Sequence, residues 1–152
     1  MPGLTNKYIE NLGQLICGDN FIGVYPCDIQ PEFKNKLCNF SVIFNTDKHN
    51  EKGSHFVAVF RKKNEIFYFD SFGKKCENEM IKKFIKINLR GKKYRYNNIC
   101  IQNDKSLLCG LYCISFIKSQ TNKKTFKNFL TNFKKDTILN DTIVTKMIVD
   151  SI

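Results

Sequence analysis

The sequence contains no tryptophan, only three prolines and no two cysteines in C-x-x-C spacing. Its seven cysteines are odd in number and irregularly spaced, a pattern that does not fit a disulfide framework. Neither histidine, His49 or His55, has a cysteine beside it, so we expect no structural zinc site and no metal cofactor. These absences exclude a small domain held together by disulfides or metal, and they favour a reducing intracellular or intravirion setting.

The sequence also lacks any run that approaches the 18 or more apolar residues of a membrane-spanning helix. The longest apolar run, residues 107–117, is 11 residues long and contains Gly110 and Ser115, which indicates a buried core helix. The first 18 residues have no apolar block followed by a small-residue cleavage site, which argues against a secretory signal. We therefore expect neither a membrane partner nor secretion.

The apolar content is nevertheless substantial. A chain of 152 residues with 42% apolar and 13% aromatic side chains can bury a core of its own. That content excludes intrinsic disorder, which the net charge of +11 alone would have suggested. We expect one domain over residues 1–152, acting as a monomer.

The positive charge comes almost entirely from lysine, with 22 lysines against three arginines. Asparagine and isoleucine, which also have A/T-rich codons, occur 17 times each, so genome composition is one explanation of the surplus. A polyanion partner is the other explanation. The paired lysines are scattered, which fits diffuse phosphate attraction better than base readout; they lie at 62/63, 74/75, 82/83, 92/93, 123/124 and 134/135.

Hydrophobic periodicity and turn residues predict a mixture of helices and strands. Helices are expected at residues 7–16, 77–87, 107–118, 125–133 and 137–148. Extended segments are expected at residues 21–25, 40–45, 55–60, 66–70 and 98–102. The segment 55–60 is apolar on both faces, which predicts a central strand. This order predicts an α+β fold, with a small mixed or antiparallel sheet flanked by helices.

Two polar residues flank the predicted hairpin: His55 at the start of one strand and Asp70 at the end of the next. In an antiparallel pair joined at residues 62–64, the start of the first strand lies opposite the end of the second. His55 and Asp70 are therefore expected to meet at one sheet edge. The carboxylate can accept a hydrogen bond from one imidazole nitrogen and orient the other nitrogen toward a nucleophile.

The candidate nucleophile is Cys109, near the N-terminal end of the predicted buried helix. A helix N-terminus and a neighbouring imidazolium both stabilise a thiolate. Gly110 is expected to let a substrate or the histidine approach the backbone without a Cβ in the way. Gln102, seven residues before Cys109, has an amide that could donate to a developing oxyanion alongside the Cys109 backbone N–H.

Each of these four residues has a plainer interpretation when it is taken alone. A histidine at a strand start is commonly a hydrogen-bonded structural residue, and aspartate is common in turns. A free cysteine is commonly a small core residue. The prediction of a site therefore depends on the joint order of His55, Asp70, Gln102 and Cys109.

Three further residues receive structural interpretations. Cys113 falls one helical turn after Cys109, which predicts core packing. Cys100 is expected to belong to the strand that ends at Gln102, and His49, in a polar loop, is expected to be solvated.

Several segments, in this order, resemble the adenovirus-type cysteine proteases (adenain and its relatives), within the clan that includes the SUMO-specific proteases. Residues 18–25 (GDNFIGVY) are similar to an N-terminal glycine followed by Phe-x-Gly-x-Tyr. Residues 53–58 (GSHFVA) resemble Gly-x-His-Trp-x-Ala, and residues 69–73 (FDSFG) resemble the acid-x-Phe-Gly strand end. Gln102 followed by residues 109–113 (CGLYC) resembles the start of the nucleophile helix. The order His, acid, Gln, Cys differs from that of papain-type enzymes.

The resemblance implies a thiol endopeptidase of an adenovirus-like or related mobile DNA element that cleaves capsid precursors during virion maturation. It implies that Cys109 is the nucleophile, His55 its acid–base partner, Asp70 the orienting acid and Gln102 part of the oxyanion hole. It also implies substrates with small residues, often glycine, near the cut. The expected location is the virion and the infected cell, with the lysine surplus holding the enzyme on packaged DNA.

The sequence departs from the family pattern at two positions, and two rival functions are also compatible with it. Phe56 stands where the family usually has tryptophan, and Asp70 stands where adenain has glutamate. No cysteine matches the one that bonds the adenoviral activator peptide, so activation by a peptide or by DNA stays open. The rivals are a protease of ubiquitin-like modifiers and a basic nucleic-acid-binding protein on an inactive protease fold.

Overall fold

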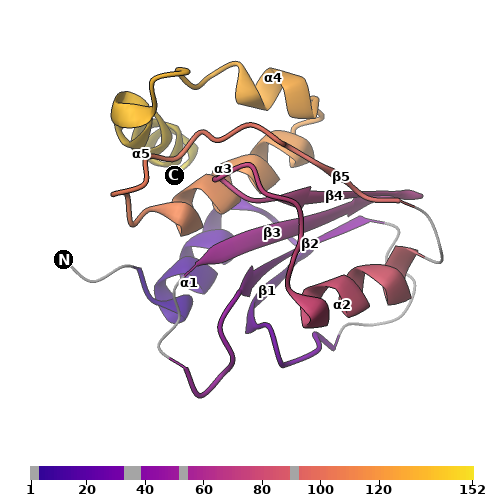
Figure 1. Ribbon diagram of the computed structural model, residues 1–152. Coiled ribbons are helices and arrows are strands. Elements are labelled where there is room, and N and C mark those ends of the chain that lie inside the picture. The colour runs from indigo at the N-terminus through magenta and orange to yellow at the C-terminus, as the bar shows by residue number, and fades with distance from the viewer. Residues whose placement is uncertain (1–3, 33–38, 52–54, 90–92) are drawn as a thin grey trace.

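The computed structural model describes residues 4–32, 39–51, 55–89 and 93–152, and it has the predicted α+β architecture (Figure 1). The strands are β1 (Phe21–Pro26), β2 (Asn39–Asn45), β3 (Phe56–Lys62), β4 (Glu65–Phe69) and β5 (Arg95–Tyr96). The helices are α1 (Asn6–Ile16), α2 (Glu79–Leu89), α3 (Cys109–Thr121), α4 (Phe126–Leu130) and α5 (Asn140–Ser151), with a 3-10 turn η1 (Thr137–Leu139). None of the helices in the described ranges is long and apolar enough to cross a membrane.

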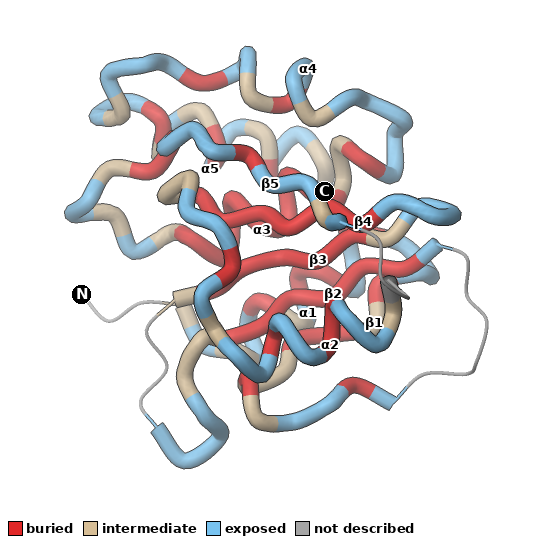
Figure 2. The backbone as a smooth tube through the Cα atoms, turned by 45° about the vertical axis from the view of Figure 1, so that its right-hand side comes forward, coloured by how far each residue is buried: buried red, intermediate tan, exposed pale blue. Residues whose placement is uncertain are grey.

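The five strands form one mixed sheet in the order β1-β2-β3-β4-β5. The central pairs β2–β3 and β3–β4 are antiparallel, whereas the outer pairs β1–β2 and β4–β5 are parallel. As predicted, β3 is the middle strand, and residues 56–60 are buried (Figure 2).

The alternation of β3 side chains divides the interior into two cores. Phe56, Ala58 and Phe60 belong to the core shared with α1, α3, α4 and α5, whereas Val57 and Val59 belong to the core beneath α2. Because a strand points successive side chains to opposite faces, both faces of β3 must be apolar.

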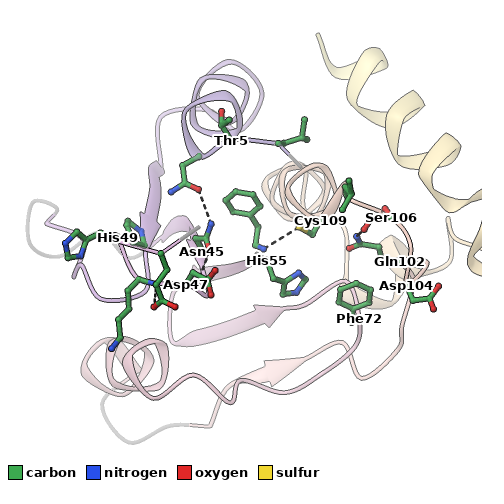
Figure 3. A pocket seen from close by; sticks show the side chains of 17 residues that line it. Thr5, Asn45, Asp47, His49, His55, Phe72, Gln102, Asp104, Ser106 and Cys109 are labelled. Atoms are coloured by element: carbon green, nitrogen blue, oxygen red, sulfur yellow. Dashed lines mark hydrogen bonds between the residues drawn. The ribbon is translucent and has the colours of Figure 1, made fainter. Parts of the chain in front are cut away.

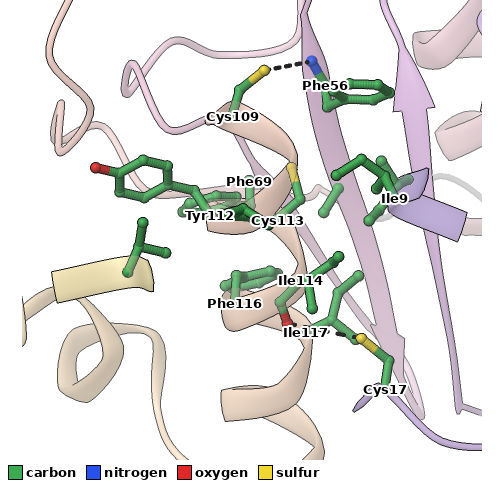
Figure 4. Packing of buried hydrophobic residues seen from close by; sticks show 14 of the residues in the cluster. Ile9, Cys17, Phe56, Phe69, Cys109, Tyr112, Cys113, Ile114, Phe116 and Ile117 are labelled. Atoms are coloured by element: carbon green, nitrogen blue, oxygen red, sulfur yellow. Dashed lines mark hydrogen bonds between the residues drawn. The ribbon is translucent and has the colours of Figure 1, made fainter. Parts of the chain in front are cut away.

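Helix α3 is the buried helix that the apolar run predicts, and Figure 4 shows its packing against its neighbours. Residues 112–114, 116 and 117 are fully buried, including Cys113, which therefore packs in the core as predicted. A helix that is apolar around its circumference is stable only when other elements cover all its sides. Here β3, α1, α4 and α5 supply that cover.

The predicted strand at residues 98–102 is wrong. The last strand is the short β5, and the chain after it is irregular because the buried Asn97 side chain takes the place of a strand partner. Asn97 accepts from the Asp70 N–H through Oδ1 (3.2 Å) and donates through Nδ2 to the Asp70 carbonyl (2.6 Å). Cys100 consequently lies outside any strand and is exposed.

The ends of the predicted C-terminal helices also need correction. Helix α3 begins at Cys109 rather than at residue 107, since the Ser106 hydroxyl accepts from the Leu108 N–H (3.2 Å) in a turn that precedes the helix. The helix predicted over 125–133 is limited to α4, and that predicted over 137–148 divides into η1 and α5. Cys109 is therefore the first residue of its helix.

Candidate active site

His55 and Asp70 meet at one end of the β3–β4 hairpin. The register pairs Ala58 with Phe69. His55, which precedes β3, and Asp70, which follows β4, therefore lie at the same end of the hairpin. His55 Nε2 lies 2.9 Å from Asp70 Oδ1, and the same oxygen accepts from the Phe72 N–H (2.8 Å). The Phe72 ring lies against the imidazole, with 5.1 Å between ring centroids. Asp70 and Phe72 together fix the orientation of His55.

Cys109 projects from the first turn of α3 toward the start of β3 (Figure 3). Its Sγ accepts a hydrogen bond from the Phe56 backbone N–H at 3.4 Å. The first N–H groups of a helix have no intrahelical acceptor, so the Cys109 N–H is among those open to a ligand. Since Nε2 of His55 is bonded to Asp70, Nδ1 is the ring nitrogen left for Cys109. The thiol thus has an imidazole, a backbone donor and a helix N-terminus around it.

The protonated form of His55 is favoured in this setting. Burial by itself lowers the pKa of the imidazole, but the hydrogen bonds with Asp70 and Cys109 outweigh that effect and raise the pKa to about 9. At neutral pH the imidazolium form of His55, with a proton on both ring nitrogens, is therefore favoured. A cysteine nucleophile reacts as its thiolate, and an imidazolium beside it stabilises that form.

Stability should fall as His55 loses this proton. The folded-state pKa of about 9 lies above the ordinary value of 6.5, so the contribution is complete below about pH 6.5 and is lost as pH rises through about 9. We expect the free energy of unfolding to drop by up to about 3 kcal/mol over that window relative to His55→Gln. Urea unfolding of both proteins from pH 6 to 10 measures the difference, and parallel pH profiles would contradict the assignment.

Gln102 lies in the same cleft, with its side chain almost fully buried. The N–H groups of Ile101 and Gln102 both donate to the Ser71 carbonyl, at 2.8 and 3.1 Å, which fastens this segment to the turn after Asp70. The Gln102 amide oxygen accepts from the Ser71 hydroxyl. Its nitrogen donates to the Ser106 carbonyl (3.0 Å) and hydroxyl (3.2 Å).

The structure thus brings the four predicted residues together. His55, Gln102 and Cys109 line a cleft of about 730 Å³, and Asp70 lies behind His55. Residues that sequence reasoning missed include Phe72 and Ser106, which lie in the cleft. Among the described residues, no group of three or more histidine, cysteine or acidic side chains is arranged to hold a metal ion.

The reason for glycine at position 110 differs from the prediction. A Cβ at Gly110 would lie 2.4 Å from Ile9 Cδ1 and 3.4 Å from Phe56 Cδ2. Ile9 is fully buried in α1. Glycine is therefore needed here for the close packing of α3 on α1 and β3, rather than for access of a substrate to the backbone.

His49 is exposed, as predicted, but it also has a partner. Its ring pairs with Asp28, and its backbone N–H donates to the same carboxylate at 2.8 Å. This pairing with His49 lowers the pKa of Asp28. His49 is thus an exposed but partnered residue at the rim of the cleft.

Three other thiols in the described chain, those of Cys17, Cys76 and Cys113, are less suited to nucleophilic chemistry. Burial raises the pKa of Cys17 to about 12 and that of Cys76 to about 11, and it raises the pKa of Cys113 as well. A raised pKa lowers the fraction of reactive thiolate. Cys38 lies outside the described residues, as do Gly53 and Ser54 of the histidine motif and Lys92.

Comparison with known proteins gives viral relatives. No protein-family model matches the chain. A protein of Acanthamoeba polyphaga mimivirus, named provisionally as a thiol protease, is 31% identical over 74% of this chain and 44% of its own length. The protease of bovine adenovirus 7 is 29% identical over 86% of this chain and 72% of its own. The chain thus spans less than half the length of the mimivirus relative.

Solved structures share the fold. The ASFV pS273R protease superposes with a TM-score of 0.53 and 14% identity, over 82% of this chain and 59% of that one. The SUMO protease Ulp1 superposes with a TM-score of 0.55 and 13% identity, over 98% of this chain and 78% of that one. This chain is thus similar in sequence to viral proteins named as proteases, and it shares its fold with the ASFV pS273R protease and the SUMO protease Ulp1.

Proposed function

We propose that this protein is a thiol endopeptidase of an adenovirus-like virus or related mobile DNA element, and that it cleaves capsid precursors during virion maturation. The observation that carries the proposal is the 2.9 Å contact between His55 Nε2 and Asp70 beside a cysteine at a helix N-terminus. The viral relatives support a viral setting. Virion and infected cell are the proposed locations, and the monomer is the proposed active form.

The site residues supply the steps of peptide-bond hydrolysis. The Cys109 thiolate forms a bond to the scissile carbonyl carbon, and the carbonyl electron pair moves to oxygen. The Cys109 backbone N–H and the Gln102 amide donate to this oxyanion. His55 gives its proton to the leaving amine as the C–N bond breaks, which leaves a thioester on Cys109. His55 then takes a proton from the attacking water, and the thiolate leaves.

In the free protein, the Gln102 amide nitrogen donates only to Ser106 among the described residues. It must therefore give up one of these two hydrogen bonds to donate to the oxyanion. The Ser106 hydroxyl contact, at 3.2 Å, is the longer of the two. We expect a bound substrate to draw one N–H of the amide toward the oxyanion while the 3.0 Å bond to the Ser106 carbonyl is kept.

DNA is the proposed accessory partner. The charge of +11 and the scattered lysine pairs support non-specific binding to packaged DNA, which would concentrate the protease near its capsid substrates. Lys74, Lys75, Lys134 and Lys135 are exposed and free of any catalytic assignment. They are therefore the pairs to reverse in charge.

The test is a set of parallel digestions. Wild-type protein and Cys109→Ala are incubated with capsid precursors encoded by the same genome, and with a ubiquitin-like probe that ends in Gly-Gly. Cleavage of the precursors by the wild type alone is expected. Equal cleavage by both proteins would sink the proposal, and preference for the ubiquitin-like probe would favour a modifier protease.

The role of DNA is tested in the same reactions, with and without duplex DNA at low and high salt. We expect DNA to speed cleavage of DNA-bound precursors at low salt only, and we expect charge reversal of the two lysine pairs to remove this effect. Cleavage of a short free peptide should be unchanged in that variant. Undetectable DNA binding at low salt would leave codon composition as the explanation of the charge.

A further inference from the structure

We propose that Asp141, on α5, is a positioning residue that fixes the side-chain amide of Gln102 through Ser106. The kinetic part of this inference rests on the proposed function, whereas its structural part does not. Asp141 lies outside the motifs that resemble the protease family, the last of which ends at residue 113.

The Asp141 carboxylate accepts two hydroxyl hydrogen bonds on one oxygen. The Ser106 hydroxyl donates to Oδ1 at 2.7 Å, and the Tyr112 hydroxyl donates to the same atom at 2.9 Å. Asp141 is in the first turn of α5, where the helix dipole favours a negative charge. An ionised carboxylate only accepts hydrogen bonds, so the direction of both bonds is determined.

This direction determines how Ser106 meets Gln102. A serine hydroxyl has one hydrogen to donate and two lone pairs to accept with. Its hydrogen goes to Asp141, so the hydroxyl acts as acceptor for Gln102 Nε2 and for the Leu108 N–H, each at 3.2 Å. Only the nitrogen of the Gln102 amide can face such an acceptor.

The other end of the amide agrees with this arrangement. The Gln102 oxygen accepts from the Ser71 hydroxyl, so the nitrogen is left on the Ser106 side. A flipped amide would turn its oxygen toward the Ser106 carbonyl, which also only accepts, so this contact already disfavours the flip. Because Asp141 keeps the Ser106 hydroxyl an acceptor, it adds a second contact that only the amide nitrogen satisfies. The flipped amide would present an acceptor where the oxyanion requires a donor.

The adjacent residue anchors α5 beside the same segment. Asn140 is fully buried, and its Nδ2 donates to the Ile101 carbonyl at 2.8 Å. Asn103 donates to the Thr137 hydroxyl at 3.2 Å. The turn η1 and the start of α5 therefore contact the chain on both sides of Gln102, which gives Asp141 a fixed position relative to the site.

The kinetic test uses Asp141→Asn, with Asp150→Asn as the matched control. Asp150 is on the same helix, is exposed and pairs only with Lys146 among the contacts resolved in the described chain. We expect Asp141→Asn to lower kcat about tenfold with KM within about twofold, because the asparagine amide can donate to Ser106. Asp150→Asn should match the wild type. In a Gln102→Ala background Asp141→Asn should have no further effect, and an equal loss in both backgrounds would overturn the proposal.

A second measurement does not need activity. In the inactive Cys109→Ala protein, the Gln102 side-chain NH2 resonances are followed by NMR. Asp141→Asn and Ser106→Ala should both shift them, whereas Asp150→Asn should leave them in place. If no peptide is cleaved by the wild type, the proposed function fails and this measurement still decides on Asp141. Unshifted Gln102 resonances in both variants overturn the inference, and Ser106→Ala carries the test if Asp141→Asn does not fold.

Discussion

Alanine at Cys109 or at His55 is expected to slow peptide cleavage by about 10⁴-fold or more, and alanine at both positions is expected to slow it no further. The two side chains act as one unit, since the thiolate attacks only when the imidazolium stabilises it and later protonates the leaving amine. Once either is missing, the other has no partner in the reaction. The loss should appear in kcat, because neither side chain supplies most of the substrate contacts.

Single-turnover cleavage of a fluorogenic peptide measures both single variants and the double variant. Cys76→Ala is the matched control, because Cys76 lies in the core beneath α2, on the other face of the sheet from the cleft. Its rate should equal that of the wild type. A double variant slower than either single variant by the product of the two losses would contradict a joint mechanism.

The sequence was sufficient to predict His55 and Asp70 as a pair. The apolar segments 55–60 and 66–70 and the short turn between them determine an antiparallel hairpin, and a hairpin determines which ends meet. The position of Cys109 followed from the apolar run of α3, although the exact start of the helix did not. Local periodicity therefore accounts for the His55–Asp70 pair and for the helix that carries Cys109, but not for the approach of that helix to β3.

The contacts that support the site had no comparable signal. Asn97 reaches Asp70 across 27 residues of sequence, and Ser106 reaches Asp141 across 35. Hydrogen bonds between such distant residues leave no periodic pattern. The irregular chain that Asn97 stabilises was accordingly predicted as a strand. The close contact between Gly110 and Ile9 was also missed, because Ile9 lies on another helix that is distant in sequence. These features depend on how the elements pack, which no local pattern records.

Gly73→Ala is expected to destabilise the protein by about 3–4 kcal/mol and to disturb the site, because two costs combine at this residue. Gly73 has φ +76°, in the left-handed region that favours glycine. A Cβ there would also lie 2.6 Å from the Ile99 carbonyl carbon and 2.7 Å from the Cys100 nitrogen. Backbone atoms cannot rotate away as a side chain can. Relief requires the 99–102 segment to move and breaks its bonds to the Ser71 carbonyl.

Gly18→Ala separates the two costs. Gly18 has φ +81°, but an added Cβ meets no heavy atom within 4 Å, so only the conformational cost of about 1 kcal/mol applies. Urea unfolding of both variants therefore measures the backbone contact as the difference between them. Because the Ser71 carbonyl holds the Gln102 N–H, Gly73→Ala should also lower kcat while Gly18→Ala should not. Equal destabilisation by the two substitutions would mean that the close approach of the Gly73 turn to residues 99 and 100 does not hold Gln102 in place.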